Sequence, residues 1–187
     1  MERGTVYFTE IPECRNGRAA EHLTGERLLG EAVRRSFDLD LSEEIRDTGP
    51  HGKPFFPLHP EIHYNISHSG RYVYCVLAPC EVGVDIQEHR NIALERMLKR
   101  TVPEELREEI LGSAHAEKLF FDQWALREAY CKMTGSGLAA DLTLLPLEQA
   151  WHWLFQPEEG YSGAICCSVP LELEWHSVDV RDRSEYE

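Results

Sequence analysis

The sequence lacks a long hydrophobic run, and this absence argues against a membrane protein built from helices. No apolar stretch in its 187 residues approaches the roughly 20 residues that a helix needs to cross a bilayer. Residues 1–30 are polar and charged, so no signal peptide is predicted either. We therefore expect a cytoplasmic protein without a membrane partner. We also expect it to be a monomer.

Basic residues are scarce as well. The chain has 19 lysines and arginines against 33 aspartates and glutamates, which gives a formal net charge of −14. Because nucleic-acid phosphates bind basic surfaces, this balance argues against a nucleic-acid partner. An anionic ligand would have to be held by a local cluster of basic side chains or through a metal ion.

CxxC pairs are also missing, although the chain has six cysteines. The spacing of the cysteines and histidines does not match a zinc site, and no small secreted disulfide framework is apparent. We expect reduced and mostly buried thiols at Cys14, Cys75, Cys80, Cys131, Cys166 and Cys167.

No long glycine, serine or proline tract divides the chain, and helical and extended patterns follow each other along it. Residues 161–170 repeat the pattern of residues 71–80, with aromatic and small apolar residues followed by cysteine and proline, which is a weak sign of duplication. Helices are predicted at 24–39, 94–100, 103–111 and 117–133. A loop is predicted at 48–62, followed by a hairpin of two strands at 62–78 and a further strand at 81–87.

The strand "EVGVDIQEHR" at residues 81–90 carries polar groups on one face. Alternation directs Val82 and Val84 to one side, and Asp85 and Gln87 to the other. We expect the two polar side chains to stand at the solvent edge, about 6 to 7 Å apart, a spacing that can hold a hard cation. Taken alone, the pattern also fits an ordinary strand with one wet face.

A second charged pair lies on the helix predicted at 117–133. Glu128 and Lys132 are four residues apart and share a face, which alone would be a surface pair that contributes about 0.2 to 0.5 kcal/mol. Beside Asp85 and Gln87, however, Glu128 would add a third oxygen ligand, and Lys132 would hold an anion. Mg²⁺ fits this set, because it takes one or two carboxylates and completes its coordination with waters and phosphates.

Other polar residues would hold the rest of a phosphorylated small molecule. "NISHS" offers Ser67 and His68, and the loop offers Gly52, Lys53 and Pro54. His68 alone also fits an ordinary strand histidine with its hydrogen bonds satisfied.

Four motifs in order, "GKP", "NISHS", "VGVDIQ" and "WALREAYCKMTGSGL", resemble the 4'-phosphopantetheinyl transferases of the surfactin-synthetase-activating type. The resemblance covers about residues 20 to 140. It implies an α+β fold of two similar halves related by a pseudo-two-fold axis, residues 1–82 and 83–187. The second half would carry the metal site, and coenzyme A would lie in the cleft between the halves.

The resemblance also implies the reaction and the residues. The phosphopantetheine arm of coenzyme A would move to a serine of an acyl or peptidyl carrier protein, in fatty acid, polyketide or nonribosomal peptide synthesis, releasing 3',5'-ADP. It implies Asp85 and Glu128 as Mg²⁺ ligands with Gln87 as the third, Asp85, Glu128 and Lys132 as catalytic residues, and Gly52, Lys53, Pro54, Ser67, His68 and Lys132 as coenzyme A contacts. The family's basic contacts to the 3'-phosphate have no clean match in this sequence, and Arg15 and Arg18 are the nearest candidates.

Two departures from the family pattern leave alternatives open. Gln87 stands where many members have glutamate, so either its amide oxygen binds the metal directly or a water lies between the two. Arg127 stands where the family has a lysine. A coenzyme A-binding or nucleotide-binding module that has lost catalysis therefore remains an alternative, as does a structural or interaction protein. The segment 91–100, with Arg96, Lys99 and Arg100, is the expected docking surface for an acidic carrier.

Overall fold

The computed structural model describes residues 1–11, 17–137 and 141–180, except for the side chain of Arg18. Its helices are α1 (Arg18–Phe37), α2 (Leu94–Thr101), α3 (Glu104–Leu111) and α4 (Ala116–Thr134), with short 3₁₀ turns η2 (Leu142–Leu144) and η3 (Leu147–Gln149). Its strands are β1 (Glu2–Glu10), β2 (Asp47–Thr48), β3 (Pro54–Phe55), β4 (His63–Ser69), β5 (Tyr72–Ala78), β6 (Val82–Glu88), β7 (Trp151–Phe155), β8 (Tyr161–Cys167) and β9 (Leu171–Ser177). The expected α+β class is confirmed.

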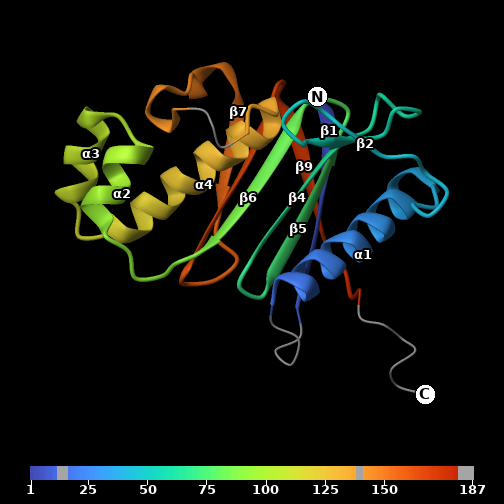
Figure 1. Ribbon diagram of the computed structural model, residues 1–187, viewed down its shortest axis with the longest axis horizontal. Coiled ribbons are helices and arrows are strands. Elements are labelled where there is room, and N and C mark those ends of the chain that lie inside the picture. The colour runs from blue at the N-terminus through green and yellow to red at the C-terminus, as the bar shows by residue number, and fades with distance from the viewer. Residues whose placement is uncertain (12–16, 138–140, 181–187) are drawn as a thin grey trace.

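The strands form two main sheets and one short pair. The larger sheet has the order β4-β5-β1-β9, in which β9 lies parallel to β1, and the smaller sheet has the order β6-β8-β7. Strands β2 and β3 pair with each other over the loop before β4. The strands β4 and β6 are both sheet edges, and Figure 1 shows them side by side in the middle of the molecule.

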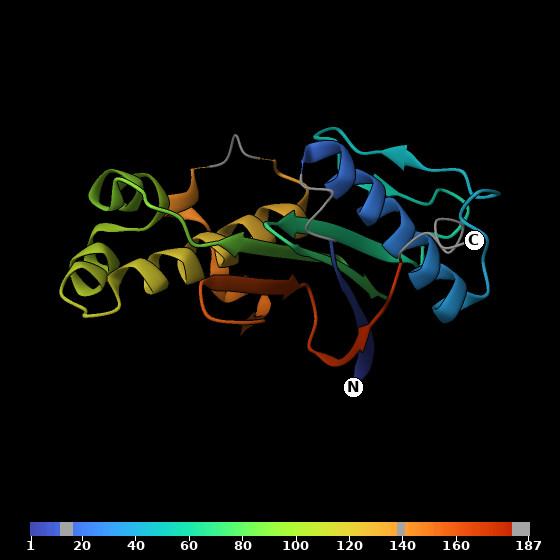
Figure 2. The ribbon, with the colours of Figure 1, turned by 90° about the horizontal axis from the view of Figure 1, so that it is seen from below.

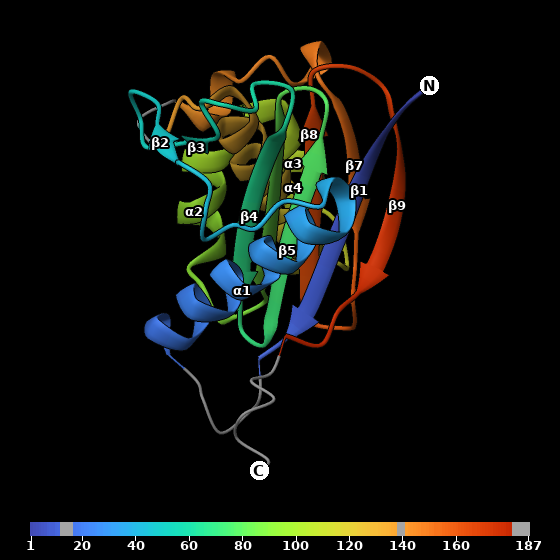
Figure 3. The same cartoon turned by 90° about the vertical axis from the view of Figure 1, so that its right-hand side faces the viewer.

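Helices cover the outer faces of both sheets. One apolar cluster lies between α1 and the larger sheet, a second between the two sheets, and a third between α4 and the smaller sheet. A fourth cluster joins α2, α3 and α4 at the end of the molecule away from α1, as Figure 2 shows. Figure 3, viewed from the side, shows α1 lying across the strands.

Most of the predicted elements are confirmed. Helix α1 buries Leu28, Leu29 and Val33 completely, as its apolar spacing predicts. Strands β4 and β5 form the hairpin, and α4 ends at Gly135, whose φ of 65° is the left-handed conformation typical of a helix C-cap. No helix of the described residues is long and apolar enough to span a membrane. The five cysteines of the described residues are free, and all but Cys80 are buried, whereas Cys14 lies outside the described part of the chain.

The two predicted halves meet near the start of β6. That strand begins at Val82, and the smaller sheet and α2 to α4 all follow it in the chain. Strand β9, however, returns from the end of the chain to pair with β1 of the larger sheet. Strands β5 and β8, which carry the repeated sequence pattern, are both buried at every residue. The division into residues 1–82 and 83–187 and its pseudo-two-fold axis stay predictions.

One expectation about β6 is wrong. Asp85 does not lie at a solvent edge, because α4 covers the face of β6 that carries it, and Asp85 is 3% exposed. Gly83 makes this packing possible, since a Cβ there would clash with the backbone of Ala129 and Met133. The opposite face, with Val82 and Val84, is buried between the sheets as predicted.

We therefore predict that Gly83→Ala destabilises the protein by at least about 1 to 3 kcal/mol, because the added methyl group must displace α4 from β6. Gly30→Ala in α1 is the matched control: its added Cβ meets Leu41 at an ordinary 3.6 Å, and alanine favours a helix by about 0.5 to 1 kcal/mol. Urea unfolding measures both changes. Equal stability of the two variants would contradict the close packing at Gly83.

Candidate active site

Asp85 and Lys132 form the centre of the site. The Lys132 Nζ donates to Asp85 Oδ1 at 2.7 Å and to the carbonyl oxygen of Val84 at 3.1 Å. The side chain of Asp85 is 4% exposed and that of Lys132 is 29% exposed. A buried carboxylate is tolerated only when it is paired with a positive charge and hydrogen-bonded. Lys132, on α4, provides both the ion pair and a hydrogen bond to Asp85.

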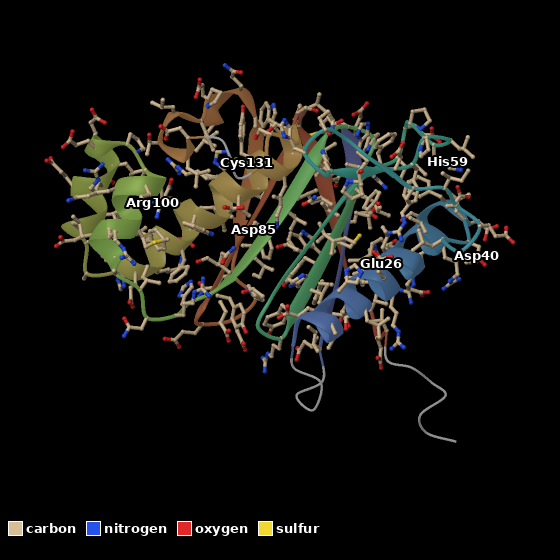
Figure 4. All side chains as sticks on the ribbon, viewed as in Figure 1. Glu26, Asp40, His59, Asp85, Arg100 and Cys131 are labelled. Atoms are coloured by element: carbon tan, nitrogen blue, oxygen red, sulfur yellow. The ribbon has the colours of Figure 1, made fainter. Side chains whose placement is uncertain are left out.

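Two further side chains complete the surroundings of Asp85. Ser67, on β4, donates to Asp85 Oδ1 at 3.0 Å, and Gln87 donates its amide to Asp85 Oδ2 at 2.7 Å. Gln87 thus lies beside Asp85 as the strand pattern predicts, and its amide oxygen is the atom left for a metal or a water. Figure 4 labels Asp85 near the middle of the molecule.

Glu128 lies one helical turn before Lys132 and is 8% exposed. Burial raises the pKa of Glu128 from 4.5 to about 7; the negative charge of Asp85 adds to this effect, and Lys132 opposes it. None of the described residues donates a hydrogen bond to its carboxylate. A buried carboxylate without a donor, next to a second carboxylate, is a place where a cation would be stabilised.

The glycine-lysine-proline loop shares a pocket with Glu128 and Lys132, whereas Asp85 does not line this pocket. A pocket of about 240 Å³ is lined by Gly52, Lys53 and Pro54 on the loop, and by Glu128 and Lys132 on α4. The sequence-predicted loop and the predicted charged pair are thus brought together. The Lys53 Nζ is bound internally, to the Glu81 carboxylate and, at 2.6 Å, to the carbonyl oxygen of Met133 at the end of α4.

Other predicted contacts lie outside this pocket. His68 points toward α1, where its Nδ1 lies 3.3 Å from a carboxylate oxygen of Glu21, and it does not line the pocket. Arg18 is the first residue of α1, but its side chain, like all of Arg15, lies outside the described part of the structure. Arg127 turns away from the site and donates to the carbonyl oxygen of Leu142 at 3.2 Å.

Sequence reasoning missed Asn65. This residue is 7% exposed, lines the pocket, and accepts a hydrogen bond from the backbone N–H of Val84 at 2.9 Å. Its position two residues before Ser67 on the same strand face was the available signal. His51 and Cys131 also line the pocket and were not predicted to do so.

The donor set suits Mg²⁺ rather than a metal held by protein alone. Among the described residues, no group of three or more histidine, cysteine, aspartate or glutamate side chains is arranged to bind a metal ion. Asp85 and Glu128 supply two carboxylates, and Gln87 supplies an amide oxygen. Mg²⁺ is commonly bound by one or two carboxylates, with waters and substrate phosphates as its other ligands.

Comparison with known proteins places this chain in a family. Residues 81–183 match the 4'-phosphopantetheinyl transferase superfamily. The 4'-phosphopantetheinyl transferase Sfp of Bacillus subtilis (strain 168) is 34% identical over 166 residues, which cover 79% of this chain and 74% of Sfp. The chain belongs to the 4'-phosphopantetheinyl transferase superfamily, which confirms the resemblance that its motifs indicate.

Two other relatives have similar names. The 4'-phosphopantetheinyl transferase psf-1 of Bacillus pumilus is 31% identical over 127 residues, covering 67% of this chain and 54% of psf-1. The L-aminoadipate-semialdehyde dehydrogenase-phosphopantetheinyl transferase of Saccharomyces cerevisiae is 30% identical over 155 residues, covering 76% of this chain and 56% of the yeast protein.

The raised pKa of Glu128 predicts that this residue destabilises the metal-free protein. Since the folded-state pKa of about 7 exceeds the ordinary 4.5, the stability contributed by protonated Glu128 is fully present below pH 4.5 and lost as the pH rises through 7. The loss is at most about 3 kcal/mol. Glu128→Gln should therefore raise the melting temperature in EDTA at about pH 8, and the difference from the unsubstituted protein should shrink toward pH 5.

Thermal unfolding of both proteins across this pH range measures the effect. A 187-residue protein shifts by about 2 to 4 °C for each kcal/mol. If Glu128→Gln melted below the unsubstituted protein at the higher pH, the Glu128 carboxylate would have a stabilising partner in the folded state.

Proposed function

We propose that the protein transfers the 4'-phosphopantetheine arm of coenzyme A to a serine of an apo carrier protein, with Mg²⁺, and releases 3',5'-ADP. Membership in the superfamily supports the transferase class. The observation that carries the proposal is the pocket in which Glu128 and Lys132 lie beside the glycine-lysine-proline loop, with the Asp85 carboxylate bound to the Lys132 amine at 2.7 Å.

The metal would be held by Asp85 and Glu128, with the Gln87 oxygen as a third ligand or through a water. When bound, Mg²⁺ neutralises charge on the diphosphate of coenzyme A. Lys132, now paired with Asp85, lines the pocket and would contact the same diphosphate. Its amine can exchange one anionic partner for another, because a bound cation would take over the neutralisation of Asp85.

The chain's own residues would then perform the transfer. The carrier serine hydroxyl would lose its proton to the Glu128 carboxylate or to a water that Glu128 orients. The serine oxygen forms a bond to the phosphorus that carries the pantetheine arm. The bond from that phosphorus to the 3',5'-ADP oxygen breaks, and Lys132 stabilises the negative charge left on this oxygen.

The 3'-phosphate contact is proposed for the region between β4 and α1. His68 is exposed there beside Glu21, and Arg18 begins the same helix. A dianionic phosphate would accept a hydrogen bond from His68 and would be attracted by the N-terminus of α1.

We predict that Asp85→Ala and Glu128→Gln each lower the transfer rate by about 100-fold or more, because each removes a metal ligand and Glu128 also accepts the proton. Gln87→Ala should cost only about tenfold, since the amide adds no charge to the metal site, and Gln87→Glu should retain activity. Incubation with coenzyme A, Mg²⁺ and several apo carriers, followed by mass spectrometry of the carriers, measures the transfer.

The same assay separates the proposal from its alternative. A protein that binds coenzyme A in calorimetry but adds no mass to any carrier would be a binding module without catalysis. If Gln87→Ala were as inactive as Asp85→Ala, Gln87 would be an essential ligand, and the assigned order of importance would be wrong.

Carrier docking is proposed for helix α2. Arg96, Lys99 and Arg100 are all exposed on this helix, and none of the three forms an ion pair with another described residue. Leu98 is fully buried, so this part of the predicted apolar face packs into the core. Figure 4 shows Arg100 at the end of the molecule formed by α2 and α3.

Reversing Lys99 and Arg100 to glutamate should raise the KM for an acidic carrier, and the effect should fade at high salt, since exposed charges are screened beyond about 8 Å at physiological ionic strength. Reversing Arg34 and Arg35, in the last turn of α1, to glutamate is the control, because it changes the net charge by the same amount. Steady-state kinetics with purified carrier at low and high salt measures both. An equal rise in KM in the two variants would indicate a net-charge effect rather than docking on α2.

A further inference from the structure

The edges of the two sheets are joined by side chains rather than by a backbone ladder. Along β4, Asn65, Ser67 and Ser69 each accept a hydrogen bond from a backbone N–H of β6. The donors are Val84 at 2.9 Å, Ile86 at 3.2 Å and Glu88 at 2.9 Å. Because every second residue of a strand faces the same way, the three side chains form one row, which we call the seam.

Ser67 is the only residue of the seam that also touches the charged centre. Its hydroxyl donates to Asp85 Oδ1 at 3.0 Å, and it accepts from Lys132 Nζ at 2.9 Å as well as from the backbone of Ile86. A serine hydroxyl has one donor and two acceptor positions, so all of its hydrogen-bonding capacity is used. Ser67 is 4% exposed.

We propose that Ser67 is a positioning residue for Asp85 and Lys132, and not a coenzyme A contact as the family motif implies. This inference rests on the proposed function, because the groups that it holds are those of the proposed Mg²⁺ site. To donate to a phosphate oxygen of coenzyme A, the Ser67 hydroxyl would have to give up its one donor bond, which goes to Asp85 Oδ1. That exchange would release the carboxylate that the reaction needs in place.

These hydrogen bonds let Ser67 hold Asp85 and Lys132 in position relative to β6. Its bond to Ile86 fixes the hydroxyl to β6 itself, one residue from Asp85, and its bond to Lys132 reaches the helix that covers β6. The Asp85 carboxylate and the Lys132 amine are therefore both held by the Ser67 hydroxyl oxygen. When Lys132 leaves Asp85 for a diphosphate, Ser67 continues to orient Asp85 Oδ1, so the carboxylate keeps its direction toward a metal.

Ser69 provides a matched control within the same seam. It accepts a bond of the same kind from the backbone of Glu88, but it touches neither Asp85 nor Lys132. Ser67→Ala and Ser69→Ala therefore each remove one seam bond, and only the first removes contacts to the charged centre. Ser67→Thr keeps the hydroxyl and tests rescue.

The experiment measures binding without turnover. Mg²⁺ is titrated by calorimetry into each protein saturated with coenzyme A and without a carrier, and coenzyme A is titrated separately in EDTA. We expect Ser67→Ala to weaken Mg²⁺ binding by about 10- to 100-fold, Ser67→Thr to restore most of it, and Ser69→Ala to leave it unchanged. Coenzyme A affinity in EDTA should be the same in all variants.

Two outcomes would overturn the inference. One is a loss of coenzyme A affinity in EDTA on Ser67→Ala with Mg²⁺ affinity retained, which would make Ser67 a coenzyme contact. The other is an equal loss of Mg²⁺ affinity on Ser69→Ala, which would assign the effect to loosening of the whole seam.

If even the unsubstituted protein fails to bind Mg²⁺, that result contradicts the proposed function and not the role of Ser67. The role of Ser67 is then tested by a measurement without metal. In urea unfolding with EDTA, a double-mutant cycle combines Asp85→Asn with Ser67→Ala or with Ser69→Ala. Positioning by Ser67 predicts a coupling of about threefold or more in the unfolding equilibrium constant for the first pair and none for the second. No coupling in either pair would overturn the inference.

Discussion

The buried ion pair between Lys132 and Asp85 is the contact on which the rest of the site depends. It joins α4 to β6, and Ser67 connects the pair to β4, so three elements distant in sequence meet at one carboxylate. Taking these charges out of water is costly unless both are paired and hydrogen-bonded. The pair can form only because Gly83 lets the backbone of α4 approach β6. Loss of this approach would therefore disturb the fold and the chemistry together.

The two carboxylates of the site differ in what neutralises them. Asp85 has a lysine, a serine and an amide as partners, whereas no described residue donates to Glu128, whose pKa is raised to about 7. A cation bound between them would lower the energy of ionised Glu128 and free Lys132 for an anionic ligand. The metal-free site is thus stable enough to fold, but electrostatically incomplete. This incompleteness links the stability of the free protein to the binding of metal and diphosphate.

Much of the fold and the grouping of the charged residues could be predicted from sequence, because local spacing determines which side chains share a face. The hairpin of β4 and β5, the helix that carries Glu128 and Lys132, and the neighbouring positions of Asp85 and Gln87 all follow from such spacing. The covering of Asp85 could not be predicted, since alternation distinguishes two faces of a strand but not which layer covers each. The roles of Ser67 and Asn65 depend on the contact between β4 and β6, which local patterns do not encode. His68, one residue from Ser67, lies on the opposite side, toward α1.

A crystal structure of the protein with coenzyme A and Mg²⁺ would show the proposed site itself. We expect a metal ion between Asp85 and Glu128, with the Lys132 amine moved from Asp85 to the diphosphate and the Ser67 hydroxyl still bound to Asp85. We also expect α4 to keep its place on β6 at Gly83. A diphosphate bound away from Lys132, with the Lys132–Asp85 pair intact and no metal at Glu128, would contradict the proposed site.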